Sequence, residues 1–415
     1  MTQRSAWPQR PPQSQRAEID ALVPAMTGWR HHFHAHPEVA FAEHATADFV
    51  AALLEEFGYA VHTGLAETGV VGTLQVGDGP GRIGLRADMD ALHLMETSGV
   101  PHASRHPGMM HACGHDGHMA MLLGAARHLA TTRRFSGTLH VIFQPAEEGR
   151  GGGRRMVEEG LFRQFPCDQV FGLHNWPEAP QGTITVHTGP VMAAADQFEI
   201  TISGRGCHAA MPHHGIDPVV VAAQIITACQ TLISRNTDPL DSAVLSITTV
   251  TSGTAFNIIP AQARLTGTVR SFRPAVRAAL EQRLRALVTG IATAFGAEAE
   301  CVWRPGYPAT INHPHAAALA RQVAVAVVGE EQVRDDSPPS MGAEDFAYML
   351  EACPGAYVWL GQGREGGAMV HSPHYDFCDA ILPVGVHYWA TLVETALPAM
   401  CAASPAGAPG SPTGA

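Results

Sequence analysis

Three histidines, an aspartate and a cysteine fall within the eight residues HACGHDGH at 111–118. The thiol of Cys113 lies two residues before His115, and such a pair suits a redox group, a nucleophile with its base, or two metal ligands. A small core residue is a fourth interpretation of Cys113. The pair alone does not distinguish these four roles of Cys113. The role depends on which other residues lie near the pair in the folded chain.

Four further polar clusters lie at strand ends or in loops. They are RADMD at 86–90, QPAEEGRGGG at 144–153, LHNW at 173–176 and HSPHYDF at 371–377. Because the carboxyl ends of parallel strands meet at one edge of a sheet, we expect the chemical side chains of all five clusters to converge there. The converging set is Asp88, Asp90, Cys113, His115, Glu147, Glu148, His174 and His371.

The residue types in this set suit a transition metal. Imidazole, thiolate and carboxylate together favour Zn²⁺, Mn²⁺, Co²⁺ or Ni²⁺ over Ca²⁺ and Mg²⁺. Five ligands from separate loops exceed what one four-coordinate ion needs, so two ions that share a thiolate or a carboxylate are the natural interpretation. Two metals about 3.5–4 Å apart can activate one water and polarise one carbonyl.

The adjacent glutamates Glu147 and Glu148 of QPAEEGRGGG are the most informative pair of residues. Consecutive residues in an extended turn point in different directions, so one carboxylate can bind metal while its neighbour faces the attacking water as general base. Glutamates in a glycine-rich loop are, however, commonly just solvated. The histidines of RHHFHAHPE at 30–38 are interpreted as structural or surface residues. Four other histidines are interpreted in the same way: His102, His106, His111 and His118. Of these, His118 is expected to cover a helix face.

Strands alternate with helices in both outer parts of the chain, which indicates an α/β domain with a largely parallel sheet. The expected strands are 72–77, 82–90, 137–145, 169–176 and 356–363, and the expected helices include 118–132, 315–329 and 379–400. Between them, the order of elements is β-α-β-β-α-β, as in a ferredoxin-like domain. We therefore predict one α/β domain made of 17–192 and 305–400, interrupted by a smaller inserted ferredoxin-like (α+β) domain at 193–304.

Composition excludes several classes of protein. The 415 residues carry a formal net charge of −12, which makes nucleic acid and anionic membranes poor partners. The eight cysteines form no CxxC pair, and no apolar run reaches the ~18 residues of a spanning helix. The N-terminus lacks the apolar region of a secretion signal, so a cytoplasmic location is expected. The ends at 1–16 and 401–415 are expected to be disordered.

A family resemblance rests on eight motifs in the same order from about residue 20 to 395. They are RADMDAL, HACGHDGHMAMLLGAA, FQPAEEG, GLHNWP, GRGCHAAMPHHGIDPV, FNIIP, MGAEDFAYML and HSPHYDF. The chain resembles the aminoacylase and carboxypeptidase superfamily of two-metal amidohydrolases, and within it the hippurate hydrolase and indole-acetyl-amino-acid hydrolase subgroup. The resemblance implies a two-metal exopeptidase-like α/β domain with an inserted lid that forms homodimers or higher homo-oligomers.

The resemblance also implies a role for each matched position. Glu147 matches the general base, and Asp90 matches an acid that supports the ligands. His208 matches a histidine that reaches the partner subunit's site and stabilises the oxyanion. Asn257, and less directly Arg270, match substrate-binding positions. The implied ligands of two divalent ions, with the first residue as their bridge, are Cys113, His115, Glu148, His174 and His371.

The function so implied is hydrolysis of the amide bond of N-acyl or N-aroyl amino acids, such as hippurate, to a carboxylic acid and a free amino acid. Zn or Mn is the expected metal, with Co or Ni as alternatives. A dipeptidase or another amide hydrolase of the superfamily is the nearest alternative function. A non-catalytic binding protein on this fold, or a cysteine hydrolase that uses Cys113 with His115, are the more distant ones.

Overall fold

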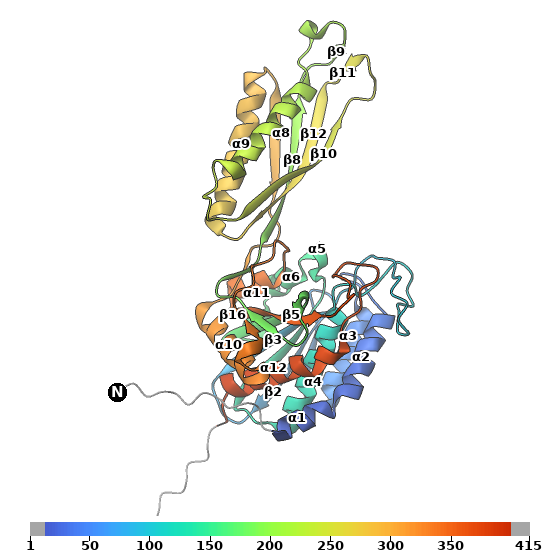
Figure 1. The fold of residues 1–415 in the computed structure, drawn as a ribbon, viewed down its shortest axis with the longest axis vertical. Coiled ribbons are helices and arrows are strands. Elements are labelled where there is room, and N and C mark those ends of the chain that lie inside the picture. The colour runs from blue at the N-terminus through green and yellow to red at the C-terminus, as the bar shows by residue number, and fades with distance from the viewer. Residues whose placement is uncertain (1–12, 400–415) are drawn as a thin grey trace, which may run out of the picture.

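The computed structural model describes residues 13–399. The chain forms a larger body and a narrower one above it, here called the lid, which comprises residues 194–304 (Figure 1). Of the predicted tails at 1–16 and 401–415, residues 1–12 and 401–415 lie outside the described residues. The prediction of disorder is wrong for residues 13–16, because they belong to helix α1 (Gln13–Asp20).

An eight-stranded sheet forms the centre of the larger body, in the order β1-β2-β4-β3-β5-β16-β6-β15. The strands are β1 (Ala60–Leu65), β2 (Gly69–Val76), β3 (Arg82–Asp88), β4 (Gly137–Gln144), β5 (Gln169–Pro180), β6 (Ile184–Val186), β15 (Val333–Arg334) and β16 (Gly355–Gly363). The four central strands are parallel to one another, through the pairs β4–β3, β3–β5 and β5–β16. The five strands expected from the sequence are therefore confirmed.

The sheet is mixed rather than largely parallel. The pairs β1–β2, β2–β4 and β6–β16 are antiparallel. A turn of only three residues joins β1 to β2, and so short a connection permits only an antiparallel pair. The expectation of parallel pairing thus holds for the central strands, which are the ones that carry the polar clusters.

Helices cover both faces of this sheet. One face packs against α1, α2 (Val23–Ala35), α3 (His44–Glu56), α4 (His115–Thr132), α10 (Pro314–Val328) and α12 (Leu382–Ala396). The other packs against α6 (Gly152–Glu158), α7 (Leu161–Gln164) and α11 (Phe346–Ala352), and the one-turn helix α5 (Glu147–Arg150) follows β4. Alternate residues of one strand enter different cores: Val358 faces the first set of helices, whereas Tyr357 and Trp359 face the second.

The lid is an antiparallel four-stranded sheet, in the order β10-β12-β8-β13, with two helices on one face. Its elements are β8 (Ala194–Ser203), β9 (Cys207–His208), α8 (Pro218–Ser234), β10 (Ala243–Ser252), β11 (Ile258–Ile259), β12 (Gln262–Ser271), α9 (Pro274–Ala294) and β13 (Glu298–Arg304). This is the arrangement of a ferredoxin-like fold. Alternating burial along β8 and β12 shows that one face is packed and the other open.

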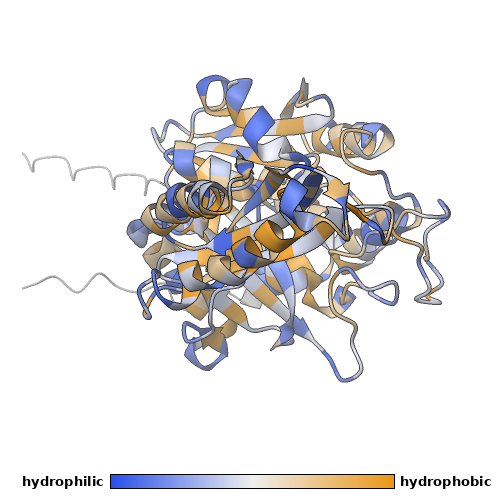
Figure 2. Cartoon of the chain, turned by 90° about the horizontal axis from the view of Figure 1, so that it is seen from above, coloured by the Kyte–Doolittle hydropathy of each residue, from blue (hydrophilic) through white to orange (hydrophobic). Residues whose placement is uncertain are grey.

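The two bodies have separate cores, and their helices show alternating hydrophobic and hydrophilic segments, as amphipathic helices do (Figure 2). The connections into and out of the lid run side by side, because β7 (Pro190–Met192) pairs with β14 (Thr310–Ile311). None of the helices in residues 13–399 combines the length and apolar character that crossing a bilayer requires.

A buried ionic network holds the start of α4 in place. Arg30 of α2 is fully buried and contacts the carboxylates of Asp116 at 3.5 Å, Asp376 at 2.8 Å and Asp379 at 2.8 Å. His34 contacts Asp116 at 2.8 Å. Burial opposes the charge on His34, but hydrogen bonds to Asp116 and Glu96 outweigh it and raise the pKa of His34 to about 9. The stretch 30–38 is thus structural, and it supports the helix that begins at the HACGHDGH cluster.

We expect Arg30→Ala to destabilise the protein by about 3–5 kcal/mol, because it leaves buried carboxylates without their cation. Chemical denaturation followed by circular dichroism measures the change. Arg82→Ala is the matched control, since the Arg82–Asp168 pair is exposed, and it should cost less than about 1 kcal/mol. Equal losses in the two variants would contradict the role given to the network.

Candidate metal centre

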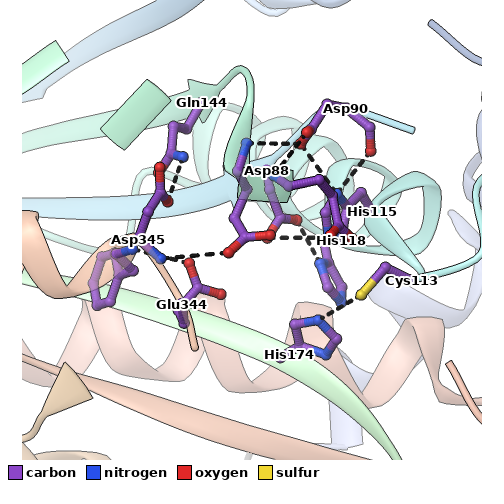
Figure 3. A network of polar contacts seen from close by, with 12 residues as sticks. Asp88, Asp90, Cys113, His115, His118, Gln144, His174, Glu344 and Asp345 are labelled. Atoms are coloured by element: carbon purple, nitrogen blue, oxygen red, sulfur yellow. Dashed lines mark hydrogen bonds and ion pairs between the residues drawn. The ribbon is translucent and has the colours of Figure 1, made fainter. Parts of the chain in front are cut away.

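The polar clusters converge at the carboxyl ends of the parallel strands. Asp88 ends β3 and Gln144 ends β4, while His174 lies within the neighbouring strand β5. His115 begins α4, which packs on β3. Figure 3 shows these side chains pointing toward one another from β3, α4 and β5.

Two groups of potential ligand atoms share the Cys113 thiol. The first consists of Cys113, His115 and His174, and the second of Cys113, Glu148 and His371. Within each group the ligand atoms all lie within 4.8 Å of one another. The Cys113 sulfur is 3.4 Å from Nε2 of His174, and Nε2 of His371 is 3.2 Å from a Glu148 oxygen. The five residues predicted as ligands thus lie together, with the predicted bridge between the two groups.

One buried atom supports the fit of cations to these groups. Nε2 of His115 is buried and makes no hydrogen bond within the described residues. Buried polar atoms are rarely left without a partner unless an ion or ligand supplies one. Imidazole, thiolate and carboxylate are donors that suit zinc-like ions. The donor set and this free imidazole nitrogen therefore fit divalent metal ions.

Asp90 connects these ligands. One of its oxygens accepts the backbone N–H of Glu147 at 3.0 Å, and the other accepts that of Glu148 at 2.9 Å. Nδ1 of His115 lies 2.8 Å from the Asp90 carbonyl oxygen, which leaves Nε2 to face the site. Asp90 thus contacts His115 and both glutamates, which supports the expectation that it orients the predicted ligands.

The segment that presents Cys113 and His115 requires a glycine between them. Gly114 has φ +98°, and a Cβ there would lie 2.1 Å from Oδ1 of Asn175 and 2.6 Å from the Tyr375 hydroxyl. Only glycine adopts this conformation without strain and without displacing those buried neighbours. The close approach brings both ligand side chains against β5.

His371 has a strained backbone with φ +63°. Its N–H donates to the carbonyl oxygen of Ala112 at 2.7 Å, which ties the loop after β16 to the residue before Cys113. Non-glycine residues in this region cost on the order of 1 kcal/mol or more and gather at functional sites. The strained histidine therefore belongs to the same centre, although its side chain is 54% exposed.

Glu147 lies in an acidic, buried corner of the centre. Its carboxylate forms a close group with those of Glu344 and Asp345, at the start of α11. Burial, and then the charges of Glu344, Glu148 and Asp345, raise the pKa of Glu147. A carboxylate that holds a proton more readily than usual suits a group that must both take and return one.

The thiol of Cys113 does not have the environment of an activated nucleophile. Burial and the charge of Glu148 raise the pKa of Cys113, whereas reactive cysteines lie in surroundings that lower it. The ligand atoms of four other residues lie within 4.8 Å of its sulfur, which favours the metal-bridging interpretation over the cysteine hydrolase: His115, His174, Glu148 and His371.

The sequence reasoning missed two parts of the centre. His118 was expected to cover a helix face, and this was wrong: it is buried, lies 2.6 Å from Asp88, and joins Asp88 and His115 in another group of possible ligands. Its spacing of three residues from His115, one helical turn, was the available signal. Arg86 is also buried and pairs with Asp88 at 2.7 Å and Glu344 at 2.9 Å. Nothing in its local sequence marks that pairing.

The predicted lid residues are not beside these ligands within one chain. His208 in β9 pairs with Ile258 of β11, and Ala209 next to it donates to the carbonyl oxygen of Asn257, so His208 and Asn257 lie together. Both are exposed, at the end of the lid away from the larger body (Figure 1). Arg270 lies on β12 opposite Ala195, near the entry to the lid.

Comparisons with known proteins identify relatives that cover most of the chain. The profile of peptidase family M20/M25/M40 matches residues 84–395. Hippurate hydrolase of Campylobacter jejuni is 41% identical over 88% of this chain and 94% of its own length. N-acetyl-L-cysteine deacetylase of Bacillus subtilis is 40% identical over 88% and 86%. The crystal structure of the Bacillus subtilis YXEP protein, a dinuclear metal binding peptidase of the M20 family, has a TM-score of 0.81 and 37% identity over 91% of this chain and 99% of that one.

We expect Cys113→Ser to lower both metal content and turnover, because a serine hydroxyl is a far weaker ligand than a thiolate. Elemental analysis of the purified protein measures the metal. Cys353→Ser is the matched control, since Cys353 is also buried but lies in the core beneath α11. A Cys113→Ser protein that keeps its full metal content would contradict the bridging role.

Proposed function

The chain belongs to peptidase family M20/M25/M40, and we propose that it is a two-metal amidohydrolase of N-acyl or N-aroyl amino acids. It would release a carboxylic acid and a free amino acid from substrates such as hippurate. The observation that carries the proposal is the pair of ligand groups that share Cys113 directly beside Glu147. The relatives named for hydrolysis or deacetylation of such amides support the same substrate class.

The proposed ligands are Cys113, His115 and His174 for one ion, and Cys113, Glu148 and His371 for the other. Two bound divalent ions supply Lewis acid chemistry, which polarises an amide carbonyl and makes water a better nucleophile. The donor set supports Zn or Mn, with Co or Ni as alternatives.

Glu147 is the proposed general base. It would take a proton from the attacking water and then deliver it to the leaving amide nitrogen. Two backbone contacts orient it: its N–H donates to Asp90, and the N–H of Asp345 lies 3.4 Å from Oε1 of Glu147. The neighbouring carboxylates of Glu344 and Asp345 support its ability to hold that proton until the nitrogen leaves.

His208 is the proposed donor to the oxyanion, and it would act in the site of a partner subunit. Support comes from its exposure at the far end of the lid, where it cannot serve its own site without a large movement (Figure 1). Strand β10 forms an edge of the lid sheet and exposes Val244 and Val250, which suits pairing with a second copy of the chain. We therefore propose a homodimer, or a higher homo-oligomer, formed through the lid.

Asn257 and Arg270 are the proposed contacts to the substrate. Asn257 lies beside His208 and would enter the partner's site with it. Arg270 supplies a cation of the kind that binds a substrate carboxylate. The seven described cysteines are free, which supports a cytoplasmic location.

Dipeptides and other small amides are the alternative substrates, because the centre would activate water toward any amide that fits. A non-catalytic binding role is disfavoured, since the ligand groups and the base are all in place.

We expect Glu147→Gln to keep its metal and to lose at least about a hundredfold in turnover of hippurate, because an amide cannot take a proton from water. Activity assays with added Mn²⁺ or Zn²⁺, together with elemental analysis, measure both properties. Glu148→Gln is the matched comparison, since it should lose metal as well as activity. Near-normal turnover by Glu147→Gln would rule out its role as the base.

We expect His208→Ala and Glu147→Gln to complement each other when they are co-expressed. In a mixed dimer, the subunit with an intact Glu147 would receive His208 from its partner, so one site of two would work. Random pairing then restores about a quarter of wild-type activity. If co-expression restores nothing while mixed dimers are isolated, His208 does not act across subunits.

A further inference from the structure

A single hydroxyl group spans the turn that carries Glu147. The hydroxyl of Tyr307 donates to the carbonyl oxygen of Glu147 at 2.6 Å and accepts the N–H of Gly151 at 2.9 Å. These two contacts lie at the two ends of the turn 147–151. Tyr307 itself follows β13 and lies in the connection that returns from the lid to the larger body.

The turn has little structure of its own to hold it. Ala146, Gly149 and Gly151 have positive φ, and Glu148 has non-helical dihedral angles although it lies within the one-turn helix α5. Contacts from outside must therefore fix the direction of the Glu147 side chain. Asp90 holds the N–H groups of Glu147 and Glu148, and Tyr307 holds the carbonyl oxygen of Glu147.

The backbone of Tyr307 is itself anchored at the junction with the lid. Its carbonyl oxygen accepts the N–H of Ala195 at 3.0 Å, next to the point where the chain enters the lid. The preceding residue, Gly306, donates its N–H to Asp196 at 3.0 Å and accepts from Arg277 at 3.1 Å. Arg277 and the buried Asp196 form a two-armed ion pair with distances of 2.8 and 2.5 Å.

The phenol remains a donor at working pH. Burial, and then the charges of Asp345 and Glu147, raise the pKa of Tyr307. The hydroxyl therefore keeps the proton with which it binds the Glu147 carbonyl oxygen.

We propose that Tyr307 is a positioning residue for Glu147, because it fixes the turn of the base to the junction between the lid and the larger body. The proposal rests on the proposed function, since it takes Glu147 as the base. The geometry has a mechanistic consequence: Ala195, Gly306 and Tyr307 link the entry and return segments of the lid, and the Tyr307 hydroxyl connects this junction to the turn of the proposed base.

The test compares Tyr307→Phe with Tyr348→Phe in the metal-loaded full chain. The first variant removes the hydroxyl and keeps the ring. The second is the matched control: the Tyr348 hydroxyl also donates at this junction, to the carbonyl oxygen of Gly306 at 3.1 Å, but it does not contact the turn. Two readouts are measured, namely amide hydrogen exchange of the segment 146–153 by mass spectrometry, and kcat and KM on hippurate with metal content determined alongside.

We expect Tyr307→Phe to speed exchange in the segment and to lower kcat by about five- to tenfold, as loss of one hydrogen bond would. KM and metal content should stay within about twofold, and Tyr348→Phe should resemble wild type in all readouts. A purely structural role would instead lower thermal stability or metal content in step with activity.

Each contrary result has its own meaning. Unchanged exchange in Tyr307→Phe would overturn the proposed tie to the turn. Faster exchange with unchanged kcat, in a protein whose Glu147→Gln variant is inactive, would overturn the positioning role and leave the proposed function standing. A wild-type protein with full metal that hydrolyses no N-acyl amino acid would overturn the proposed function, and the positioning role with it, while the exchange result would still establish whether the tie exists.

Discussion

The centre depends on one carboxylate, that of Asp90, which holds parts of the chain that are far apart in sequence. The carboxylate accepts the backbone N–H groups of both Glu147 and Glu148, and the backbone carbonyl oxygen of Asp90 lies beside Nδ1 of His115. Hydrogen bonds to an ionised acceptor are the stronger kind. The proposed base Glu147 and the proposed ligand Glu148 are adjacent and must point in different directions, and the two hydrogen bonds to Asp90 restrict both residues at once. The end of β3 thus sets the geometry of the loop after β4.

The proposed site residues are divided between the larger body and the lid. Glu147 and the turn that carries it follow β4, a strand buried on both faces, and contacts from Asp90, just after the buried strand β3, hold that turn. The lid has its own core, and it carries the exposed His208 and Asn257 at its far end. Tyr307 is where these parts meet, since it contacts both the turn of the base and the strand that enters the lid.

The sequence predicted most of the fold and the convergence of the ligands, because both follow from local patterns. Buried strands that end in polar residues must bring those residues to one edge, and His174 and Cys113 do meet there. It did not predict the burial of His118: the spacing from His115 places the two histidines on one helix face, but it does not reveal the Asp88 carboxylate opposite them. Nor could it predict the contact of Tyr307, whose partner lies 160 residues away and binds through its backbone. Contacts of this kind depend on tertiary packing alone.

The charges of the centre explain why it suits cations. Six carboxylates surround it, and the buried cation of Arg86 contacts only part of them: Asp88, Asp90, Glu147, Glu148, Glu344 and Asp345. Burying this many carboxylates is unfavourable unless cations face them or some of them hold protons, and burial does raise the pKa of both Glu147 and Asp345. Divalent cations beside Cys113 would offset the remaining negative charge. Metal binding at these groups would therefore be coupled to the protonation of Glu147 through the same carboxylates.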